Sequence, residues 1–318
     1  MNTFAARRKF LKKMLFWGCV ASMAVFMESN IYDKPIYFLS ESFTTMGTHG
    51  RIQAFDLNTP YNAACTVQNA IKRINELEKV LSKFKPFSDI SNLNTNPLVY
   101  HDVSPDTIYV MEKSNNYTKA TNGYFNVGMG NFLSLAGIDT IVPLIGSNFF
   151  KHGITNKLIK IKNNKIKLLN DNAMLDLGGI GKGYAIDEAM TILINGGIKH
   201  AAIELGGDIK VYGGMPDSSY WNIIINTNLK NDVIKLHSGS IALSSGYLKA
   251  ATTNTHNIKH HIINPKTLTS KNYYSSVLVV GEKSITCDAL STAYFNMTQT
   301  EIDKIRLKFP DYEIKTYI

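Results

Sequence analysis

The sequence predicts an α+β fold in which mixed, largely antiparallel sheets pack with helices. Helical periodicity dominates the first half of the 318-residue chain and strand-like alternation dominates the second. The regular strand-helix-strand alternation typical of a parallel sheet does not occur along the sequence. Hydrophobic residues make up 44% of the chain and aromatic residues 10%. This composition is sufficient for a well-filled core and excludes a disordered protein.

Residues 1–30 are predicted to be a signal or anchor segment, and residues 38–318 a single domain. Paired Arg7 and Arg8 precede Phe-Leu-Lys and a modest apolar run over residues 14–27, the pattern of a twin-arginine export signal. The alternatives are an ordinary signal, an uncleaved anchor in the membrane, or a lipoprotein signal ending at Cys19. The segment carries five basic side chains and one acid, so its removal would lower the net charge from +9 to about +5. The remaining chain is only mildly basic, which argues against a nucleic-acid partner.

The first half of the domain is predicted to begin with a polar linker over residues 29–37, followed by a turn and strand over residues 43–55. Apolar residues at helical spacing then predict a long amphipathic helix over residues 61–84. The segment 88–94 is rich in side chains that cap and turn. We interpret it either as a loop or as a hydrogen-bonding wall for a ligand.

A second helix is predicted from Ser104-Pro105-Asp106 to about Thr121, with proline in its first turn and an acid at its positive end. Residues 123–132 are small and aromatic, which is typical of a tight loop. The alternating lysines of residues 157–167 predict a hairpin with a solvated face. Cys65 and Cys287 allow one disulfide, but two buried thiols are expected.

The glycine-rich stretch from Met174 to Asp187 is the most informative part of the chain. An apolar run ends at Asp176, four glycines surround Lys182, and a helical pattern follows at once to about residue 195. Such a turn lets the backbone approach a ligand, and the amides that begin a helix favour negative charge. The spacing matches neither the P-loop nor the dinucleotide-binding fingerprint. A phosphate cradle and a plain helix start therefore both remain open.

The second half reads mainly as strands. They are expected at residues 201–212 with a glycine interruption, 221–226, 233–236, 241–244, 275–280 and 313–318. Helices are expected over residues 286–297 and 299–309.

Three polar groups outside the glycine stretch are candidates for chemistry. Asp288 and Thr292 lie four residues apart on one helical face, so they offer either two oxygens to a hard cation or a surface hydrogen bond. His260-His261 offers an imidazole that either moves a proton near neutral pH or is structural. Ser244-Ser245-Gly246 suits a phosphate and a turn equally well.

Taken together, these strings resemble the FAD:protein FMN transferases, the ApbE-like family. The resemblance covers residues 43–297 and is carried by eight strings in one order: Met46-Gly47-Thr48, Leu81 to Asn94, Gly123 to Asn126, Asp176 to Asp187, Glu204 to Asp208, Ser244 to Gly246, His261 to Pro265, and Asp288 to Thr292.

The resemblance implies an ApbE-like fold with an FAD site in a central cleft. It implies Mg²⁺-dependent transfer of FMN from FAD to a Thr or Ser of an acceptor protein, with release of AMP. Export would place the enzyme at the periplasmic side of a bacterial inner membrane, where it would modify an electron-transfer protein. An FAD-binding or FAD-hydrolysing protein without transfer activity is the alternative.

The resemblance also assigns roles to individual residues. Asp288, Thr292 and the carbonyl of Gly181 would hold Mg²⁺, and His261 would accept the hydroxyl proton. Met46, Ser88, Asn94, Lys182, Asp187, Gly206, Gly207 and Ser245 would bind FAD.

The chain departs from the family pattern at four positions. Asn126 and Asn264 stand where the family usually has Asp, Ser244 replaces a usual Thr, and Tyr247 follows where an acid or Asn is common. The loss of two acids removes charge near a magnesium-phosphate site, but we still expect an active enzyme.

Overall fold

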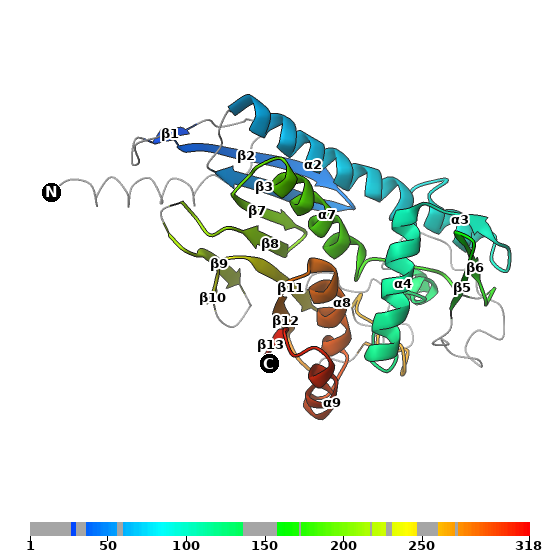
Figure 1. Ribbon diagram of the computed structural model, residues 1–318. Coiled ribbons are helices and arrows are strands. Elements are labelled where there is room, and N and C mark those ends of the chain that lie inside the picture. The colour runs from blue at the N-terminus through cyan, green and yellow to red at the C-terminus, as the bar shows by residue number, and fades with distance from the viewer. Residues whose placement is uncertain are drawn as a thin grey trace.

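The computed structural model describes residues 27–29, 36–55, 60–135, 158–171, 173–216, 218–226, 231–246, 260–270 and 273–318. Its centre is an eight-stranded antiparallel sheet with the order β1-β2-β3-β7-β8-β11-β12-β13 (Figure 1). The strands are β1 (Met27–Ser29), β2 (Ile36–Thr45), β3 (Thr48–Phe55), β7 (His200–Leu205), β8 (Asp208–Tyr212), β11 (Gly239–Ser245), β12 (Ser276–Gly281) and β13 (Glu313–Tyr317). The predicted α+β class is confirmed.

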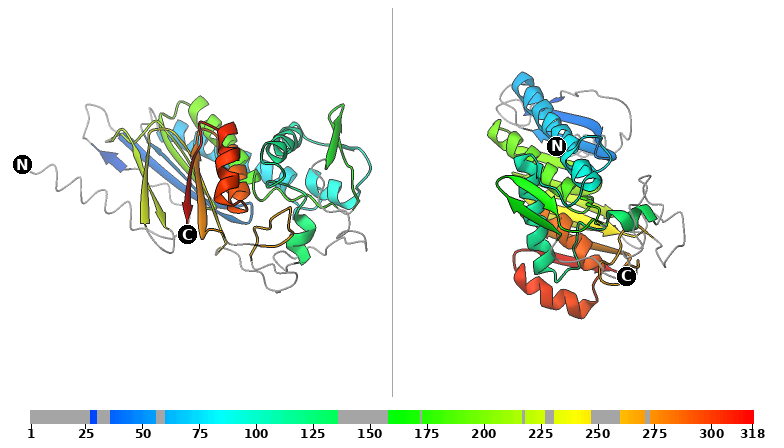
Figure 2. Two further views of the ribbon diagram at one scale, coloured as in Figure 1. Left: turned by 90° about the horizontal axis from the view of Figure 1, so that it is seen from below. Right: turned by 90° about the vertical axis from the view of Figure 1, so that its right-hand side faces the viewer.

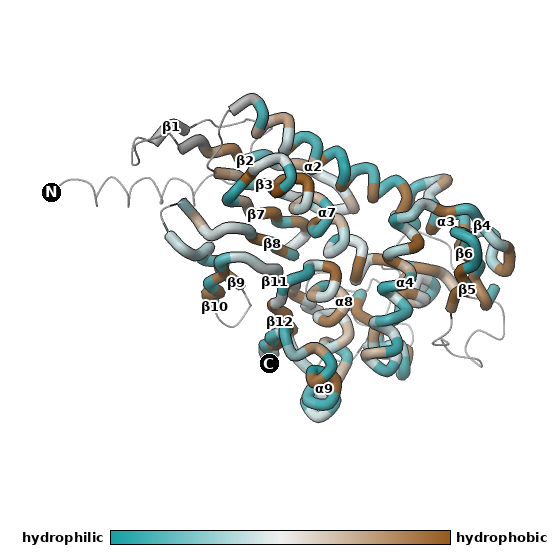
Figure 3. The backbone as a smooth tube through the Cα atoms, in the orientation of Figure 1, coloured by the Kyte–Doolittle hydropathy of each residue, from teal (hydrophilic) through white to brown (hydrophobic). Residues whose placement is uncertain are grey.

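Each face of this sheet has its own hydrophobic cluster. The helices α2 (Pro60–Leu81), α7 (Gly181–Asn195) and α8 (Ser284–Phe295) pack on one face, and the hairpin β9 (Trp221–Asn226)–β10 (Asn231–Leu236) packs on the other (Figures 1 and 2). Strand alternation divides the residues: in β3, Ile52 and Ala54 face the helices, and Phe55 faces the hairpin. The hydropathy colouring shows hydrophobic stretches along the central strands (Figure 3).

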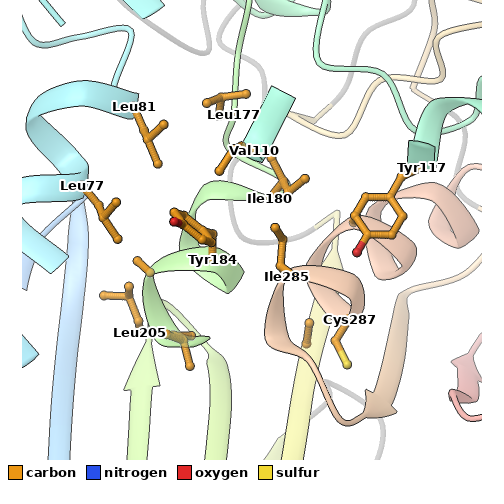
Figure 4. Packing of buried hydrophobic residues seen from close by; sticks show 14 of the residues in the cluster. Leu77, Leu81, Val110, Tyr117, Leu177, Ile180, Tyr184, Leu205, Ile285 and Cys287 are labelled. Carbon is orange, nitrogen blue, oxygen red and sulfur yellow. The ribbon is translucent and has the colours of Figure 1, made fainter. Parts of the chain in front are cut away.

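The helix-side cluster joins six of the described helices, α2, α3 (Asp89–Thr95), α4 (Pro105–Ala120), α7, α8 and α9 (Gln299–Ile305), to the sheet. Leu77 and Leu81 of α2, Tyr184 of α7 and Ile285 of α8 point into one contiguous packing region (Figure 4). Helix α4 (Pro105–Ala120) adds side chains from its buried face, including Val110.

The remaining elements flank this core: α3 (Asp89–Thr95), α5 (Gly130–Leu135), α9 (Gln299–Ile305), the short 3₁₀ helix η2 (Arg306–Lys308), and a three-stranded sheet of β4 (His101–Asp102), β6 (Lys165–Leu168) and β5 (Ile159–Lys162). The predicted lysine hairpin is confirmed as β5–β6. Its Asn163-Asn164 turn has positive φ at both residues, 50° and 57°.

One ion-pair cluster ties α2, α4 and α7 together. Arg73 on α2 donates to Asp106 on α4 at 2.9 Å and to Glu188 on α7 at 2.7 Å. The Tyr184 hydroxyl also donates to Asp106, at 2.6 Å. Burial alone would raise the pKa of Asp106, but the hydrogen bonds from Arg73 and Tyr184 outweigh it and hold this pKa below its usual value.

The structure corrects two predictions of local structure. Residues 89–95 form helix α3 rather than a loop, because Ser88 caps its start by accepting from the Ser91 amide at 2.9 Å. The glycine interruption at Gly206-Gly207 is a two-residue hairpin turn that divides the expected strand over residues 201–212 into β7 and β8.

The structure also corrects the predicted linker and the predicted burial of both cysteines. The expected polar linker over 29–37 already contains the start of β2, at Ile36. Cys65 is exposed while Cys287 is buried, and both thiols are free.

Of the predicted signal segment, the structure describes only Met27–Ser29, which pair with β2. Cys19 and Tyr247 lie outside the described residues. No helix in the described part of the chain is long and apolar enough to cross a membrane.

Candidate functional site

The candidate site is a cleft of about 610 Å³ at the start of α7. The β2–β3 and β7–β8 hairpins, helix α8 and the segment 124–133 also line it. The structure brings together eight of the predicted site residues in its lining: Met46, Gly181, Lys182, Gly206, Ser245, His261, Asp288 and Thr292.

Tight turns carry two of these residues to the cleft. Met46 and Gly47 form the two-residue turn of the β2–β3 hairpin, with φ of 51° and 69°. Positive φ is uncommon for a residue such as methionine. Gly206 occupies the neighbouring hairpin turn with φ of 60°, where a Cβ would approach the Thr48 side chain to 2.9 Å. The two turns therefore lie against each other at the cleft.

The carboxylate of Asp176 fixes the start of the glycine stretch through two contacts. One oxygen of Asp176 accepts from the Gly178 amide at 2.6 Å, and the other pairs with the buried Lys83 ammonium at 2.7 Å. Helix α7 then begins at Gly181, after an N-cap residue, Ile180, that provides no side-chain hydrogen bond.

Helices α7 and α8 cap each other at their N-terminal ends. Asp288 on α8 accepts from the Gly183 amide in the first turn of α7 at 3.1 Å. In return, Asp187 on α7 accepts from the Ser284 and Ile285 amides that begin α8, at 3.0 Å each. Because a carboxylate at the positive end of a helix is stabilising, this exchange fixes the two helix starts relative to each other.

A charged triad occupies the inner end of the cleft. The Lys182 ammonium lies 3.0 Å from Asp208 and 3.4 Å from Asp288. Burial raises the pKa of Asp288 to about 7; the Lys182 charge opposes this increase and the Asp208 charge adds to it. Burial likewise raises the pKa of Asp208, against the opposing charge of Lys182. Burial would lower the pKa of Lys182, but the two carboxylates outweigh it and hold this pKa above its usual value.

The side-chain oxygens of Asp208, Asp288 and Thr292 fit a hard cation such as Mg²⁺. Thr292 lies one helical turn beyond Asp288, and its hydroxyl would be 2.9 Å from a Cβ placed on Gly179. Asp208 is buried, and its Oδ2 lies 3.0 Å from the Lys182 ammonium. Oxygen donors with excess negative charge are the environment that Mg²⁺ prefers. Among the described residues, however, no group of three His, Cys, Asp or Glu side chains forms a metal cluster.

The two adjacent histidines have different surroundings. His260 is buried, accepts from the Ile262 amide at 3.2 Å, and packs edge-on against Phe295 with ring centroids 5.5 Å apart. His261 is half-buried and lines the cleft. Of the two imidazoles, that of His261 is the one in the lining of the cleft.

Four predicted FAD contacts lie elsewhere among the described residues. Ser88 caps α3, and Asn94 forms two hydrogen bonds with the backbone of Leu175, at 2.7 and 3.0 Å. Asp187 uses both oxygens on α8 and pairs with Lys210 at 2.8 Å. The Gly207 amide donates to the Glu204 side chain at 2.9 Å. Their polar groups support the elements around the cleft instead of lining it.

The two asparagines that stand where the family usually has Asp differ in their hydrogen bonds. Asn126 lines the cleft, and its Oδ1 accepts from the Gly128 amide at 2.8 Å, a role that Asp could also perform. Asn264 accepts from Lys266 at 2.9 Å, but its amide also donates to the Asn296 carbonyl at 3.1 Å. An aspartate at position 264 could not make that second bond.

Five charged residues of the cleft were missed as site residues from sequence: Glu78, Lys83, Lys85, Asp176 and Asp208. Asp208 follows a Gly-Gly turn in an otherwise alternating strand pattern, and Asp176 opens the glycine stretch. A charge next to a ligand-approaching glycine turn is the signal that could have identified both.

Comparison with known proteins places the chain in a family. The family model described as the ApbE family matches residues 46–313. The chain belongs to the ApbE family.

Individual members of the ApbE family are distant relatives in sequence. The protein named FAD:protein FMN transferase from Haemophilus influenzae is 25% identical over 305 residues, 89% of this chain and 87% of that protein. The protein of the same name from Vibrio cholerae is 26% identical and covers 83% of each chain.

Solved ApbE structures share the fold. The ApbE protein of Thermotoga maritima superposes with a TM-score of 0.75 at 23% identity, covering 88% of this chain and 97% of that one. The flavin transferase ApbE of Vibrio cholerae gives a TM-score of 0.74 at 20% identity, covering 89% and 98%.

Proposed function

We propose that this ApbE-family protein is an Mg²⁺-dependent transferase that moves FMN from FAD to a Thr or Ser of an acceptor protein. The names of the relatives support transfer of a flavin from FAD to a protein. The observation that carries the finer proposal is the cleft in which Lys182, Asp288, Thr292 and His261 meet. The residues present fit a diphosphate substrate that arrives with a divalent cation.

In this proposal, the hydroxyl oxygen of the acceptor attacks the phosphorus on the FMN side of the FAD diphosphate. A phosphoester bond forms, the bond from this phosphorus to the bridging oxygen breaks, and AMP leaves with that oxygen. His261 accepts the hydroxyl proton. Lys182 and the backbone around Gly206 bind the diphosphate, and Met46 and Ser245 line the flavin cleft.

The metal would be held by Asp288, Thr292 and the carbonyl of Gly181. When bound, Mg²⁺ would neutralise charge that develops on the phosphate oxygens. The capping bond from Gly183 keeps Asp288 oriented towards the start of α7.

We further propose that the enzyme is exported by the twin-arginine route and modifies an electron-transfer protein at the periplasmic side of the membrane. The paired arginines and the apolar run over residues 14–27 support this. The same run would anchor the protein if it is not cleaved.

The test is incubation of the purified protein with FAD, Mg²⁺ and a flavin-acceptor domain that contains the target Thr or Ser. Covalent flavin fluorescence on the acceptor, with one AMP released per flavin attached, is expected. Bound FAD, or free FMN and AMP without labelling, would instead identify an FAD-binding or FAD-hydrolysing protein. Replacing Asp288 by Ala should abolish labelling; persistent labelling would refute the metal assignment.

A further inference from the structure

We propose that Asp208 is part of the cation site of the cleft and that the Lys182 ammonium occupies this site until a divalent cation displaces it. This inference rests on the proposed metal-dependent function. It adds one carboxylate to the metal residues proposed above, and it gives Lys182 a role before substrate binds.

The charges of Lys182, Asp208 and Asp288 support the assignment of Asp208 to the cation site. Asp208 and Asp288 are 4% and 3% exposed, so water contributes little to their solvation. Lys182 supplies one positive charge against their two negative charges when both are ionised. A buried site with such an excess requires a further cation or a bound proton.

The geometry of Asp208 supports its membership in this site. Its Oδ2 is buried in the cleft lining, and the Lys182 Nζ lies 3.0 Å from it. Asp208 therefore faces the same ammonium as Asp288. Carboxylate oxygens are ligands that a hard divalent cation prefers, so a cation in the place of this ammonium would contact both acids.

The surroundings of Lys182 support the proposal that its ammonium occupies the cation site before a divalent cation binds. Its Nζ contacts four oxygens of the described residues: Asp208 Oδ2 at 3.0 Å, the Gly178 carbonyl at 3.2 Å, and both carboxylate oxygens of Asp288 at 3.4 Å. These are long, multiple contacts to the ligand types that a hard cation uses. The side chain is 23% exposed and flexible, which leaves it a route out of the site. Displaced from the carboxylates, the ammonium is free to pair with the diphosphate.

The experiment measures Mn²⁺ binding to the full chain without FAD, by the electron paramagnetic resonance signal of free Mn²⁺. Replacing Lys182 by Met should tighten Mn²⁺ binding by roughly tenfold or more, because the competing charge is lost. Replacing Asp208 by Asn should weaken it by a similar factor. Lys210→Met is the matched control: Lys210 pairs with Asp187 outside the cleft, so Mn²⁺ affinity should stay within about twofold of wild type.

Since Lys182→Met leaves two carboxylates unpaired, a second measurement on the wild-type protein covers the case in which this variant does not fold. Acetylation of Lys182, followed by mass spectrometry, should become at least several-fold faster at saturating Mn²⁺, while acetylation of Lys210 stays constant. Unchanged Lys182 acetylation, or unchanged Mn²⁺ affinity in Asp208→Asn, would overturn the inference.

The outcome for Asp288→Asn separates this inference from the proposed function. If that variant retains wild-type Mn²⁺ affinity, the metal site of the proposed function is wrong. If it loses affinity while Asp208→Asn and Lys182→Met do not change it, the metal site stands and only the present inference fails.

Discussion

Replacing Gly183 by Ala tests whether the close crossing of α7 and α8 builds the cleft. A Cβ at this position would lie 2.4 Å from the Ser284 carbonyl oxygen and 2.8 Å from the Ile285 Cα. Both atoms belong to the backbone, so no side-chain rotation can relieve the contact. Ordinary contacts begin at 3.4 Å, so the helices must separate by about 1 Å.

The expected cost follows from this displacement. Overpacking a well-packed interface typically costs about 1–3 kcal/mol. The better helix propensity of alanine returns at most about 1 kcal/mol. We therefore expect the free energy of unfolding to fall by about 1–2 kcal/mol. The hydrogen bond from the Gly183 amide to Asp288 should lengthen, so FAD affinity in the presence of Mg²⁺ should fall as well.

Gly181→Ala is the matched control, two residues earlier on the same helix. Among the described residues, its Cβ would meet the Leu177 Cβ at 3.7 Å, which is an ordinary contact. Urea unfolding should change by less than about 0.5 kcal/mol, and FAD affinity, measured by flavin fluorescence, should be retained. Equal stability and equal FAD affinity for Gly183→Ala and wild type would refute the role of the close crossing.

Three further predictions use paired variants or paired conditions. His261→Ala should abolish acceptor labelling, while its free energy of unfolding in urea stays within about 0.5 kcal/mol of wild type. His260→Ala should lower the free energy of unfolding by about 1–3 kcal/mol because the His260 ring is buried. Similar stability losses in both variants would contradict the different placement of the two rings. Asn264→Asp should lower stability in thermal unfolding by about 1–3 kcal/mol, because the buried Asn296 carbonyl loses its donor. Asn126→Asp should cause no such loss. The reverse order of stability would contradict the hydrogen bonds described for the two side chains. Asp106→Asn should lower the urea midpoint at pH 7, and the difference from wild type should shrink at pH 3. The pKa of Asp106 is lower in the folded protein than its usual 3.8, so its stabilising effect is present above that value and is lost as the pH falls below it. A difference that is constant with pH would count against the ion pair.

Local sequence patterns predicted much of the fold where one signal dominated. The lysine hairpin β5–β6 combined strict alternation with an Asn-Asn turn, and both were observed. Helix α3 was missed because Ser, Asn and Asp side chains dominate its composition. Its buried apolar residues, Ile90 and Leu93, lie three apart, which is helical spacing, but a seven-residue helix contains too few apolar positions for the pattern to stand out.

The site was harder to predict than the fold because it depends on which face a side chain occupies. Asp187 lies five residues after Lys182 on α7, which rotates it by about 140° around the helix. It therefore points to α8 and Lys210 instead of the cleft. Asp208 enters the cleft from a different hairpin, and no spacing along the sequence relates it to Asp288. Only the register of β7 with β8 and the crossing of α7 with α8 bring these two acids to the same lysine.

The mutual capping of α7 and α8 explains why this glycine stretch does not act as a simple anion loop. In a phosphate-binding helix start, the first amides and the positive end of the helix remain available to the anion. Here the Gly183 amide already donates to Asp288, so a carboxylate occupies part of that position. A diphosphate that approaches α7 therefore meets a negative charge fixed by the fold. Favourable binding requires a positive charge between the two anions, which Lys182 supplies in part and a divalent cation would complete.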